Sequence, residues 1–315
     1  METTGLSGGT GTYAFLIGVG TFDNLSFRVR QFFLTDPSAE RAMLAALAET
    51  LERCQCIVSF NGKSFDVPQL ATRFALSRLD DPFAGLVHVD LLHPARRLYS
   101  HLLPSSRLAE IERHLMGVRR YGDISGSLIP AMYFSYIRRR NVRGLPPIFE
   151  HNSLDVLSLA GLIGYLNETW VAEETQDAAL LLALGRWNEA RGGEAEARYV
   201  AARQASDGPA SAEATWRLCR LLKRRGEWRE CIALWETEAE SEDAARKIRA
   251  LIELSKLAEH RMKDPPQALI FAQAAQQCID LSRYPARFVE TQAALARRLS
   301  RLKARAAKDR IVVSD

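Results

Sequence analysis

Acidic side chains occur at three places in the first half of this 315-residue chain, each with a distinctive polar neighbour. Glu2 begins a Glu-Thr-Thr-Gly-Leu run, Asp66 ends an Asn-Gly-Lys-Ser-Phe-Asp run, and Asp155 follows His151 by four residues. Converging carboxylates can hold two divalent cations about 3.5–4 Å apart and support phosphodiester hydrolysis. Their oxygen atoms suit Mg²⁺ or Mn²⁺. On a helix, His151 would lie one turn from Asp155, where it can orient or deprotonate the attacking water.

This ordered set resembles the DEDD 3′–5′ exonucleases of the ribonuclease H-like superfamily. Their first motif is Asp-x-Glu, commonly followed by Thr-Thr-Gly-Leu; here Met1 occupies the x position and the preceding Asp is missing. The second motif, Asn-x-x-x-Phe-Asp, is matched by Asn61, Phe65 and Asp66. The third motif is His-x₄-Asp or Tyr-x₃-Asp, whereas this chain combines His151 with the three-residue gap.

The intervening segments strengthen the resemblance. Residues 89–93, 106–112, 122–126 and 129–130 are similar to the YprB-type branch of the superfamily, so that the likeness covers residues 2 to about 166. It implies a catalytic set of four residues, three of them metal ligands and one a water-positioning histidine. The metal ligands are Glu2, Asp66 and Asp155, and the histidine is His151. The residues implied on the substrate side are Thr3, Asn61, Lys63 and Phe65.

The missing first Asp bears directly on activity. In the family this residue lies in the central strand and commonly bridges both metal ions, so its loss should cost at least the 10–100-fold that follows loss of an outer-shell partner. Either the start is assigned too late, or the chain is a shortened, inactive form. We expect weak or no activity from Met1, and a truncated first strand in the sheet.

Each candidate residue also has a purely structural interpretation. Asp66 and His151 can cap the helices that follow them, and Lys63 can be a solvated loop lysine. Asp90 and Asp123 are expected to be structural or to face the substrate. The cluster Arg138–Arg140 with Arg143 is either a solvated helix end or a contact to a nucleic-acid backbone.

The elements that position these residues follow from hydrophobic periodicity. Residues 13–20 and 26–34 are β-rich and flank a turn, which predicts an antiparallel pair. Short apolar runs at 56–60 and 86–90 predict buried strands. Helical patterns start near residue 36 and recur at 107–116, 126–140 and 151–166. Residues 1–168 are therefore predicted to form an α/β domain around a mixed sheet, of the ribonuclease H-like class.

The second half has helical periodicity and an internal repeat. The segment Gly192–Ala197 resembles Gly226–Cys231, which begins 34 residues later, and Lys263–Ala268 follows after a further 37 residues. A turn, a helix and a small residue at that period are typical of tetratricopeptide (TPR) repeats. We expect an all-α TPR-like domain at 172–300 that binds a protein or peptide, and a basic, frayed tail at 301–315. An irregular helical bundle is the alternative.

Bulk composition narrows the class of protein. With 42 Lys and Arg against 38 Asp and Glu, the net charge of +4 is mild, so any affinity for nucleic acid must come from local patches. The five cysteines lack the spacing of zinc ligands, which favours a reduced cytoplasmic protein. No apolar run reaches the ~18 residues that a membrane span needs.

The predicted activity is 3′–5′ exonucleolytic hydrolysis of single-stranded nucleic acid. A non-catalytic adaptor with a partner-binding helical domain is the alternative, and an endonuclease on the same fold is a third. The motifs leave DNA and RNA equally open as substrates, because recognition of the 2′-hydroxyl depends on contacts that no motif here encodes.

Overall fold

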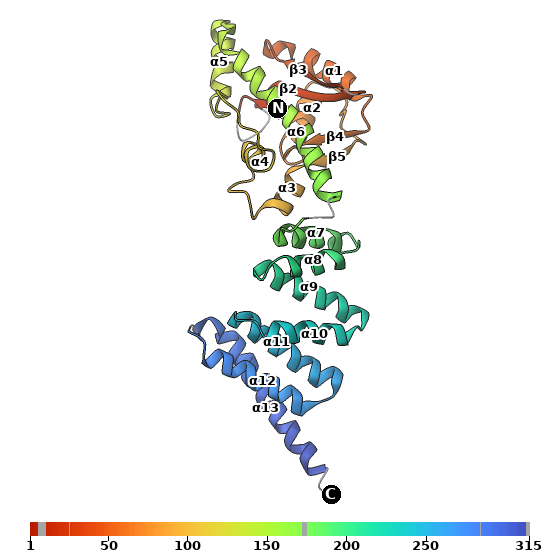
Figure 1. Cartoon of the computed structure of the whole chain (residues 1–315). Helices are drawn as coiled ribbons and strands as arrows, with labels where there is room; N and C mark the ends of the chain where they lie inside the picture. Colours follow the sequence, from red (N-terminus) through yellow and green to blue (C-terminus); the bar gives the residue numbers. More distant parts are fainter. Residues whose placement is uncertain (6–10, 25, 172–174, 284, 313–315) are drawn as a thin grey trace. The chain divides into compact units, whose positions relative to one another are not determined.

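The chain divides into two compact units, Met1–Glu173 and Glu174–Asp315 (Figure 1). The computed structural model describes residues 1–5, 11–24, 26–171, 175–283 and 285–312. The first unit contains every strand of the described chain, and the second is helical. The first unit therefore holds the predicted acidic groups, and the second holds the predicted repeats.

An antiparallel sheet opens the first unit. Its order is β1 (Glu2–Thr3), β2 (Ala14–Asp23) and β3 (Ser26–Phe33). The antiparallel pair predicted from the two β-rich runs is confirmed, and it turns at Asn24, whose φ of 54° is a left-handed conformation that asparagine tolerates. The inner face of this pair is apolar, with Phe15 among the fully buried side chains.

A separate parallel pair follows, β4 (Cys56–Ser59) with β5 (Val87–Asp90). Among the described residues the strands thus form two sheets, whereas the sequence predicted a single mixed sheet. The physical reason is that β1 contains only two residues, and these bond to β2. Strands form at both apolar runs, but the predicted burial is wrong: Cys56 of β4 is exposed, and Val87 and Val89 of β5 are 63% and 41% exposed.

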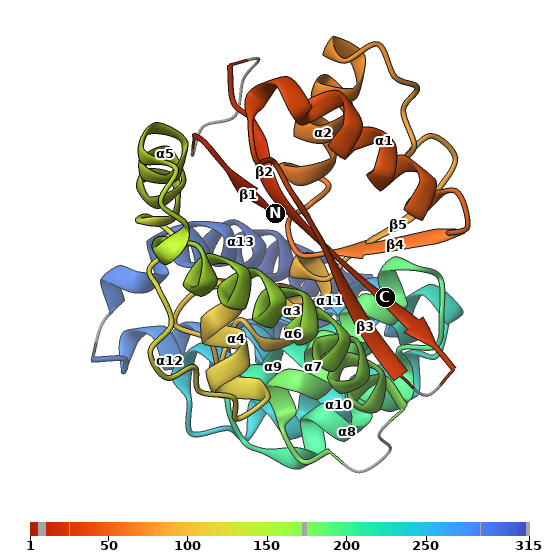
Figure 2. The same ribbon diagram turned by 90° about the horizontal axis from the view of Figure 1, so that it is seen from above.

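Helices flank the strands of the first unit. In chain order they are α1 (Glu40–Leu51), α2 (Asp66–Leu76), α3 (Leu92–Tyr99), α4 (Leu108–Leu115), α5 (Ile129–Arg139) and α6 (Pro146–Val171). Helix α6 packs against β2 and β3, and Figure 2 shows α6 on one side of this β-ribbon with α1 and α2 on the other. Because α6 begins five residues before His151, this histidine lies inside the helix and does not cap it.

Aromatic packing ties α5 to the antiparallel sheet. The rings of Phe15 and Tyr133 stack with centroids 4.0 Å apart, and the Tyr133 hydroxyl donates to the carbonyl of Leu34 at 2.9 Å. Burial raises the pKa of Tyr133 to about 12. A buried ion pair between Arg73 and Glu40, with Nε–Oε1 at 2.6 Å, joins α2 to α1. These contacts hold fixed the frame on which β1 and α6 meet.

The second unit is a succession of antiparallel helices. They are α7 (Ala178–Ala190), α8 (Glu196–Ala205), α9 (Pro209–Arg225), α10 (Trp228–Ala239), α11 (Ala244–Leu257), α12 (Pro265–Asp280) and α13 (Val289–Val312). Each packs chiefly against its neighbours in sequence, and Figure 1 shows them following one another in chain order. A π-helical turn, Ala258–Met262, extends α11.

Close helix crossings recur along this unit. The pairs in contact are Gly185 with Tyr199, Cys219 with Cys231, and Ser255 with Ala268. A Cβ on Gly185 would lie 2.6 Å from the Tyr199 ring, and the Ser255 hydroxyl donates to the Ala268 carbonyl at 2.8 Å. The first members of the pairs recur after 34 and then 36 residues.

The residue at the first crossing differs from the one that the alignment of the three segments predicts. Ala197, the small residue expected at the first crossing, is exposed, and Tyr199 is buried in its place. Tyr199, Cys231 and Ala268 are each the fourth residue of their helix. The opposing Gly185 explains the shift, because the missing side chain on one helix leaves room for a large ring on the other.

The segment expected to be a basic, frayed tail is helical as far as the structure describes it. Helix α13 continues to Val312, with Leu302 fully buried. Arg301 and Arg305 both bind Glu259, which is itself 3% exposed. Packing of one leucine and neutralisation of a buried carboxylate therefore hold this part of α13, and residues 313–315 lie outside the described residues.

Candidate metal and catalytic site

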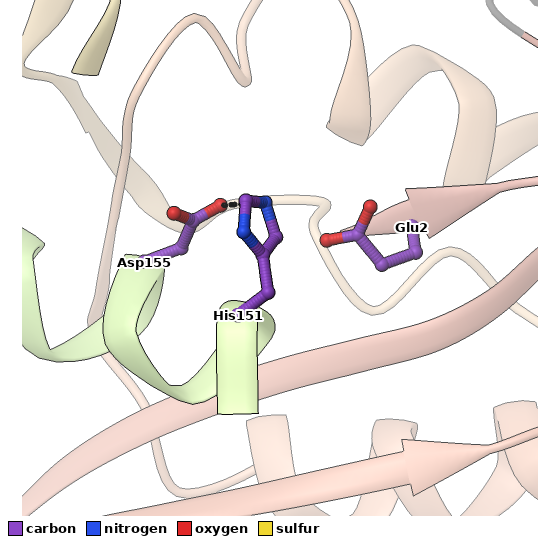
Figure 3. Close-up of side chains that lie close together, drawn as sticks. All are labelled: Glu2, His151 and Asp155. Atoms are coloured by element: carbon purple, nitrogen blue, oxygen red, sulfur yellow. Dashed lines mark ion pairs between the residues drawn. The ribbon is translucent and has the colours of Figure 1, made fainter. Parts of the chain in front are cut away.

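Glu2, His151 and Asp155 converge in the first unit, although Glu2 is about 150 residues from the other two in the sequence (Figure 3). Each offers a ligand atom, and these atoms lie within 4.8 Å of one another. Glu2 comes from β1, and the other two come from successive turns of α6. The Nε2 atom of His151 is 3.8 Å from Oδ2 of Asp155. Two carboxylates and an imidazole at this spacing fit one divalent cation.

An amide network supports Glu2. The side-chain amide of Asn152 donates to Glu2 Oε1 at 3.4 Å, and Gln31 on β3 donates to Asn152 Oδ1 at 3.1 Å. Asn152 is fully buried against β2, where a Cβ on Gly18 would lie 2.4 Å from its Oδ1. The glycine therefore allows α6 to approach the strand closely enough for Asn152 to reach Glu2.

Asp123 orients the imidazole of His151. Its Oδ1 atom lies 2.7 Å from Nδ1 of His151. Burial opposes ionisation of Asp123, but the hydrogen bonds and charges of His151 and Arg120 prevail and hold the pKa of this carboxyl below its usual range. A carboxylate on Nδ1 favours the tautomer that keeps its proton there, which leaves Nε2 with a lone pair. His151 can accordingly accept a proton on the side that faces Glu2 and Asp155.

Arg120 is the central cation of the site. It donates to Asp155 Oδ1 at 2.7 Å and to Asp123 Oδ2 at 3.1 Å, and it forms a two-bond ion pair with Glu112. Only 9% of its side chain is exposed, and Glu112 is 1% exposed. Burial works against its charge, but bonds to Glu112 and Asp155 raise the pKa of Arg120. One oxygen of Asp155 is thus occupied, and Oδ2 remains for a ligand.

Asp66 stands outside the convergent cluster. It begins α2, and its Oδ1 atom lies 3.9 Å from the amino-terminal nitrogen of Met1. In the part of the chain that the structure describes, the group of ligand atoms within 4.8 Å of one another does not include Asp66. Burial raises the pKa of this carboxyl, and the nearby ammonium opposes the shift. The structure therefore brings together three of the four predicted catalytic residues.

The loop before Asp66 is organised by Asp90. The backbone amides of Asn61 and Lys63 donate to the Asp90 carboxylate at 2.8 and 3.0 Å. Asn61 has φ of 63°, and the side chains of Asn61 and Lys63 are exposed. The structural role expected for Asp90 is thus observed: it closes the loop and leaves the lysine facing solvent.

Two other predicted contacts have structural partners. Thr3 is 8% exposed, and its hydroxyl donates to the Gly5 carbonyl at 2.8 Å, which shapes the chain after β1. Phe65, half-buried, precedes the first residue of α2.

In the arginine cluster predicted at residues 138–140 and 143, Arg140 binds Asp36 at 2.7 Å and, together with bonds from Ser38, lowers the pKa of that aspartate to about 2. Arg140 therefore ties the end of α5 to the segment after β3.

Sequence comparison identifies the family of the first unit. Residues 1–167 match the model of the RNase_H superfamily. The chain belongs to this superfamily. It is also 32% identical over 282 residues to the uncharacterized protein YprB of Bacillus subtilis strain 168, a match that covers 88% of this chain and 67% of that protein. No solved structure matched the chain. The RNase H-like fold fits a nuclease, and nucleases of this fold usually use divalent metals.

None of the described helices is both long enough and apolar enough to cross a bilayer. The longest helices, α6 and α13, contain 26 and 24 residues.

Proposed function

We propose that this chain is a metal-dependent phosphodiester hydrolase of the DEDD type that trims single-stranded nucleic acid from its 3′ end. The observation that carries the proposal is the convergence of Glu2, His151 and Asp155 within 4.8 Å, in an RNase_H superfamily unit. Asn152 and Arg120 each hold one oxygen of Glu2 and of Asp155, so that the other oxygens can meet a shared cation.

The proposed ligands of Mg²⁺ or Mn²⁺ are Glu2, Asp155 and Asp66. When bound, such an ion makes water more acidic and stabilises charge on the phosphate oxygens. Asn152 keeps one oxygen of Glu2 in place, and Arg120 keeps Asp155 turned so that Oδ2 stays accessible. With its Nδ1 atom held by Asp123, His151 can take a proton on Nε2.

The neighbourhood of Asp66 supports the proposed role of the missing first carboxylate. The nitrogen of Met1 lies 3.9 Å from Asp66, so a residue joined there would enter the site beside it. In the Met1 form this place holds a positive ammonium group. We expect the Met1 form to be weak or inactive, and an Asp supplied before it to raise affinity for a second ion.

The proposed substrate contacts are Thr3, Asn61, Lys63 and Phe65. Lys63 is exposed on the loop that Asp90 closes, where an ammonium group can meet a phosphate. Phe65 precedes Asp66 and can pack against a base or sugar of the terminal nucleotide. DNA and RNA both fit these contacts, and the free cysteines of the chain agree with a reduced, cytoplasmic setting.

The test is Mn²⁺-dependent degradation of 3′- and 5′-labelled single-stranded DNA and RNA. The Met1 form is compared with an extended form, in which an added β-prone segment ends in Asp directly before Met1, and with Asp66→Asn and Asp155→Asn variants of the extended form. Asp80→Asn is the matched control, because Asp80 is exposed on the same unit. We expect trimming from the 3′ end by the extended wild type and by its Asp80→Asn variant. Absence of cleavage in every form would contradict the proposal.

A second function is favoured by the helical unit. The crossings that recur after 34 and 36 residues support a TPR-like repeat over residues 172–300, and solenoids of this kind present recognition surfaces. On this alternative the chain is an adaptor, the first unit is a scaffold, and the helices bind a protein or peptide. Retention of partner binding with no metal-dependent cleavage in the extended form would favour the adaptor.

A further inference from the structure

Arginine and tryptophan side chains share one surface of the second unit. We name it the Arg–Trp strip, after Trp216 and Arg220 of α9, Trp228 of α10, Arg249 and Lys256 of α11, and Arg261 of the π-helical turn. Residues 216, 220, 223 and 224 follow the spacing of one helix face, as do 249, 253, 256 and 260. The two faces adjoin each other, because Lys223 of α9 binds Glu253 of α11 at 2.6 Å.

Trp216 forms the first layer of the strip. The guanidinium carbon of Arg220 lies 4.8 Å from the centre of the Trp216 ring, and that of Arg249 lies 5.0 Å away. Both arginines are exposed, and the ring is half-buried. The cation–π contacts already order the two guanidinium groups at the surface, so that little further conformational entropy is lost when a ligand binds.

The second layer lines an open depression of about 510 Å³. Lys223, Arg224, Trp228, His260 and Arg261 are among its lining residues. The guanidinium carbon of Arg261 lies 4.0 Å from the centre of the Trp228 ring. An aromatic ring is thus again paired with an arginine, one helix further along the unit.

The acidic groups on this surface neutralise only part of its charge. Glu253 binds both Lys223 and Lys256 at 2.6 Å, and Glu189 binds Arg224 at 3.1 Å. The buried Glu259 lies 3.6 Å from His260, but it also binds three arginines of α13. Among the described residues, Arg220, Arg249 and Arg261 have no carboxylate partner. Three guanidinium groups therefore remain available to an anion.

We infer that the Arg–Trp strip binds single-stranded nucleic acid, with phosphates at the arginines and bases stacked on the Arg–Trp layers. A row of unpaired cations interleaved with aromatic rings is what a polyanion with stackable bases requires. An acidic peptide could use the cations, but it would leave the two tryptophan layers without a partner. The choice of nucleic acid rests on the proposed nuclease function; the strip itself lies wholly in the second unit.

The test uses the full chain in EDTA, so that binding is measured without cleavage. Fluorescein-labelled dT15 and U15 are titrated by anisotropy at 50–200 mM salt. We compare the wild type with Arg220→Glu/Arg249→Glu and with Trp216→Ala. The matched control is Arg297→Glu/Lys303→Glu, a double reversal at exposed positions of α13. Arg220→Gln/Arg249→Gln serves if the charge reversal impairs folding, which circular dichroism would show.

Arg220→Glu/Arg249→Glu should weaken the affinity for the oligonucleotides about ten-fold or more. The slope of log affinity against log salt concentration should fall in magnitude by about 1.4, since each phosphate contact contributes about 0.7. Trp216→Ala should weaken the affinity about ten-fold, because the stacking of a base on the ring is removed. The control should bind like the wild type. Equal binding by strip variants and wild type would overturn the inference, and so would displacement of the oligonucleotide by an equal charge of polyglutamate, which would indicate a peptide site.

A readout in the first unit separates this inference from the nuclease proposal. Hydrolysis of bis(p-nitrophenyl) phosphate by the extended form needs no strip, so the Arg220→Glu/Arg249→Glu variant should retain it. Strip-dependent binding without any hydrolysis would leave the strip valid and refute the nuclease. Hydrolysis with no strip-dependent binding would support the nuclease and refute the strip as a binding surface.

Discussion

The two charged surfaces of this protein are built in opposite ways. The acidic site of the first unit joins residues from β1, the segment before α5, and α6, and its carboxylates are held by buried partners such as Arg120 and Asn152. The Arg–Trp strip joins neighbouring helices of the second unit, and its arginines remain exposed. A site whose carboxylates depend on buried partners should lose stability after single substitutions, whereas substitutions on the exposed strip should change binding and leave stability nearly unchanged.

The largest effect is expected at Arg120. Arg120→Ala removes the partner of Glu112, a carboxylate that is 1% exposed, and should lower the free energy of unfolding by about 3–5 kcal/mol. Urea denaturation measures this. The exposed pair of Arg113 with Glu110 supplies the matched control, Arg113→Ala, with an expected change within ~0.5 kcal/mol. Equal effects at the two arginines would show that the acidic site is not held by its buried cation.

The next effect concerns the orientation of His151. Asp123→Asn keeps the size of the side chain but removes the carboxylate that holds Nδ1, and kcat of the extended form should fall about 100-fold with little change in KM. Labelled-oligonucleotide kinetics measure both constants. Asp80→Asn should leave them unchanged. If instead KM rises and kcat persists, Asp123 contacts the substrate and does not position the histidine.

A smaller effect tests the helical unit. Gly185→Ala places a Cβ 2.6 Å from the Tyr199 ring and should destabilise the protein by about 1–3 kcal/mol. Gly164→Ala in α6 has no atom within 4 Å of its new Cβ and should stabilise by up to about 1 kcal/mol. Thermal unfolding of the two variants compares them. A neutral Gly185→Ala would mean that this crossing does not fix the register of the repeat.

The smallest effect is expected at Asp66. Burial raises its pKa in the folded state, so the ionised carboxylate destabilises the fold at neutral pH. Asp66→Asn should therefore raise the free energy of unfolding at pH 7 in EDTA by about 0.5 kcal/mol or more. The gain should vanish below about pH 3.9, where the unfolded carboxyl is protonated too. A destabilised Asp66→Asn at pH 7 would indicate that the Met1 ammonium outweighs burial.

Periodicity was sufficient to predict most elements of the first unit. The β-rich runs at β2 and β3 and the short apolar runs at β4 and β5 predicted these strands, whereas the burial predicted for β4 and β5 was wrong, because Val87 and Val89 are exposed. Periodicity did not predict the division of the strands into two sheets, because that division depends on the strand to which the two residues of β1 bond. Periodicity predicted the helical character of the second unit, but the small residue expected at the first crossing was wrongly placed, because Gly185 leaves room there for the large ring of Tyr199.

The site divides in the same way. Glu2, His151 and Asp155 could be recognised from motif order, because each motif is local. Arg120 has no periodicity or motif around it, and although Asp123 is only three residues away, Glu112 and Asp155 become its neighbours only in the folded unit. The strip was missed for the same reason, because Arg249 reaches the Trp216 ring across two helices.

Mn²⁺ affinity of the acidic site is the most direct test of the central claim. Electron paramagnetic resonance counts free Mn²⁺ in titrations of the extended wild type, Glu2→Gln, Asp155→Asn and the Asp80→Asn control. We predict saturable binding that weakens at least ten-fold in Glu2→Gln and in Asp155→Asn and is unchanged in the control. Binding that ignores both substitutions would contradict the account, because the convergence of Glu2, His151 and Asp155 would then hold no metal.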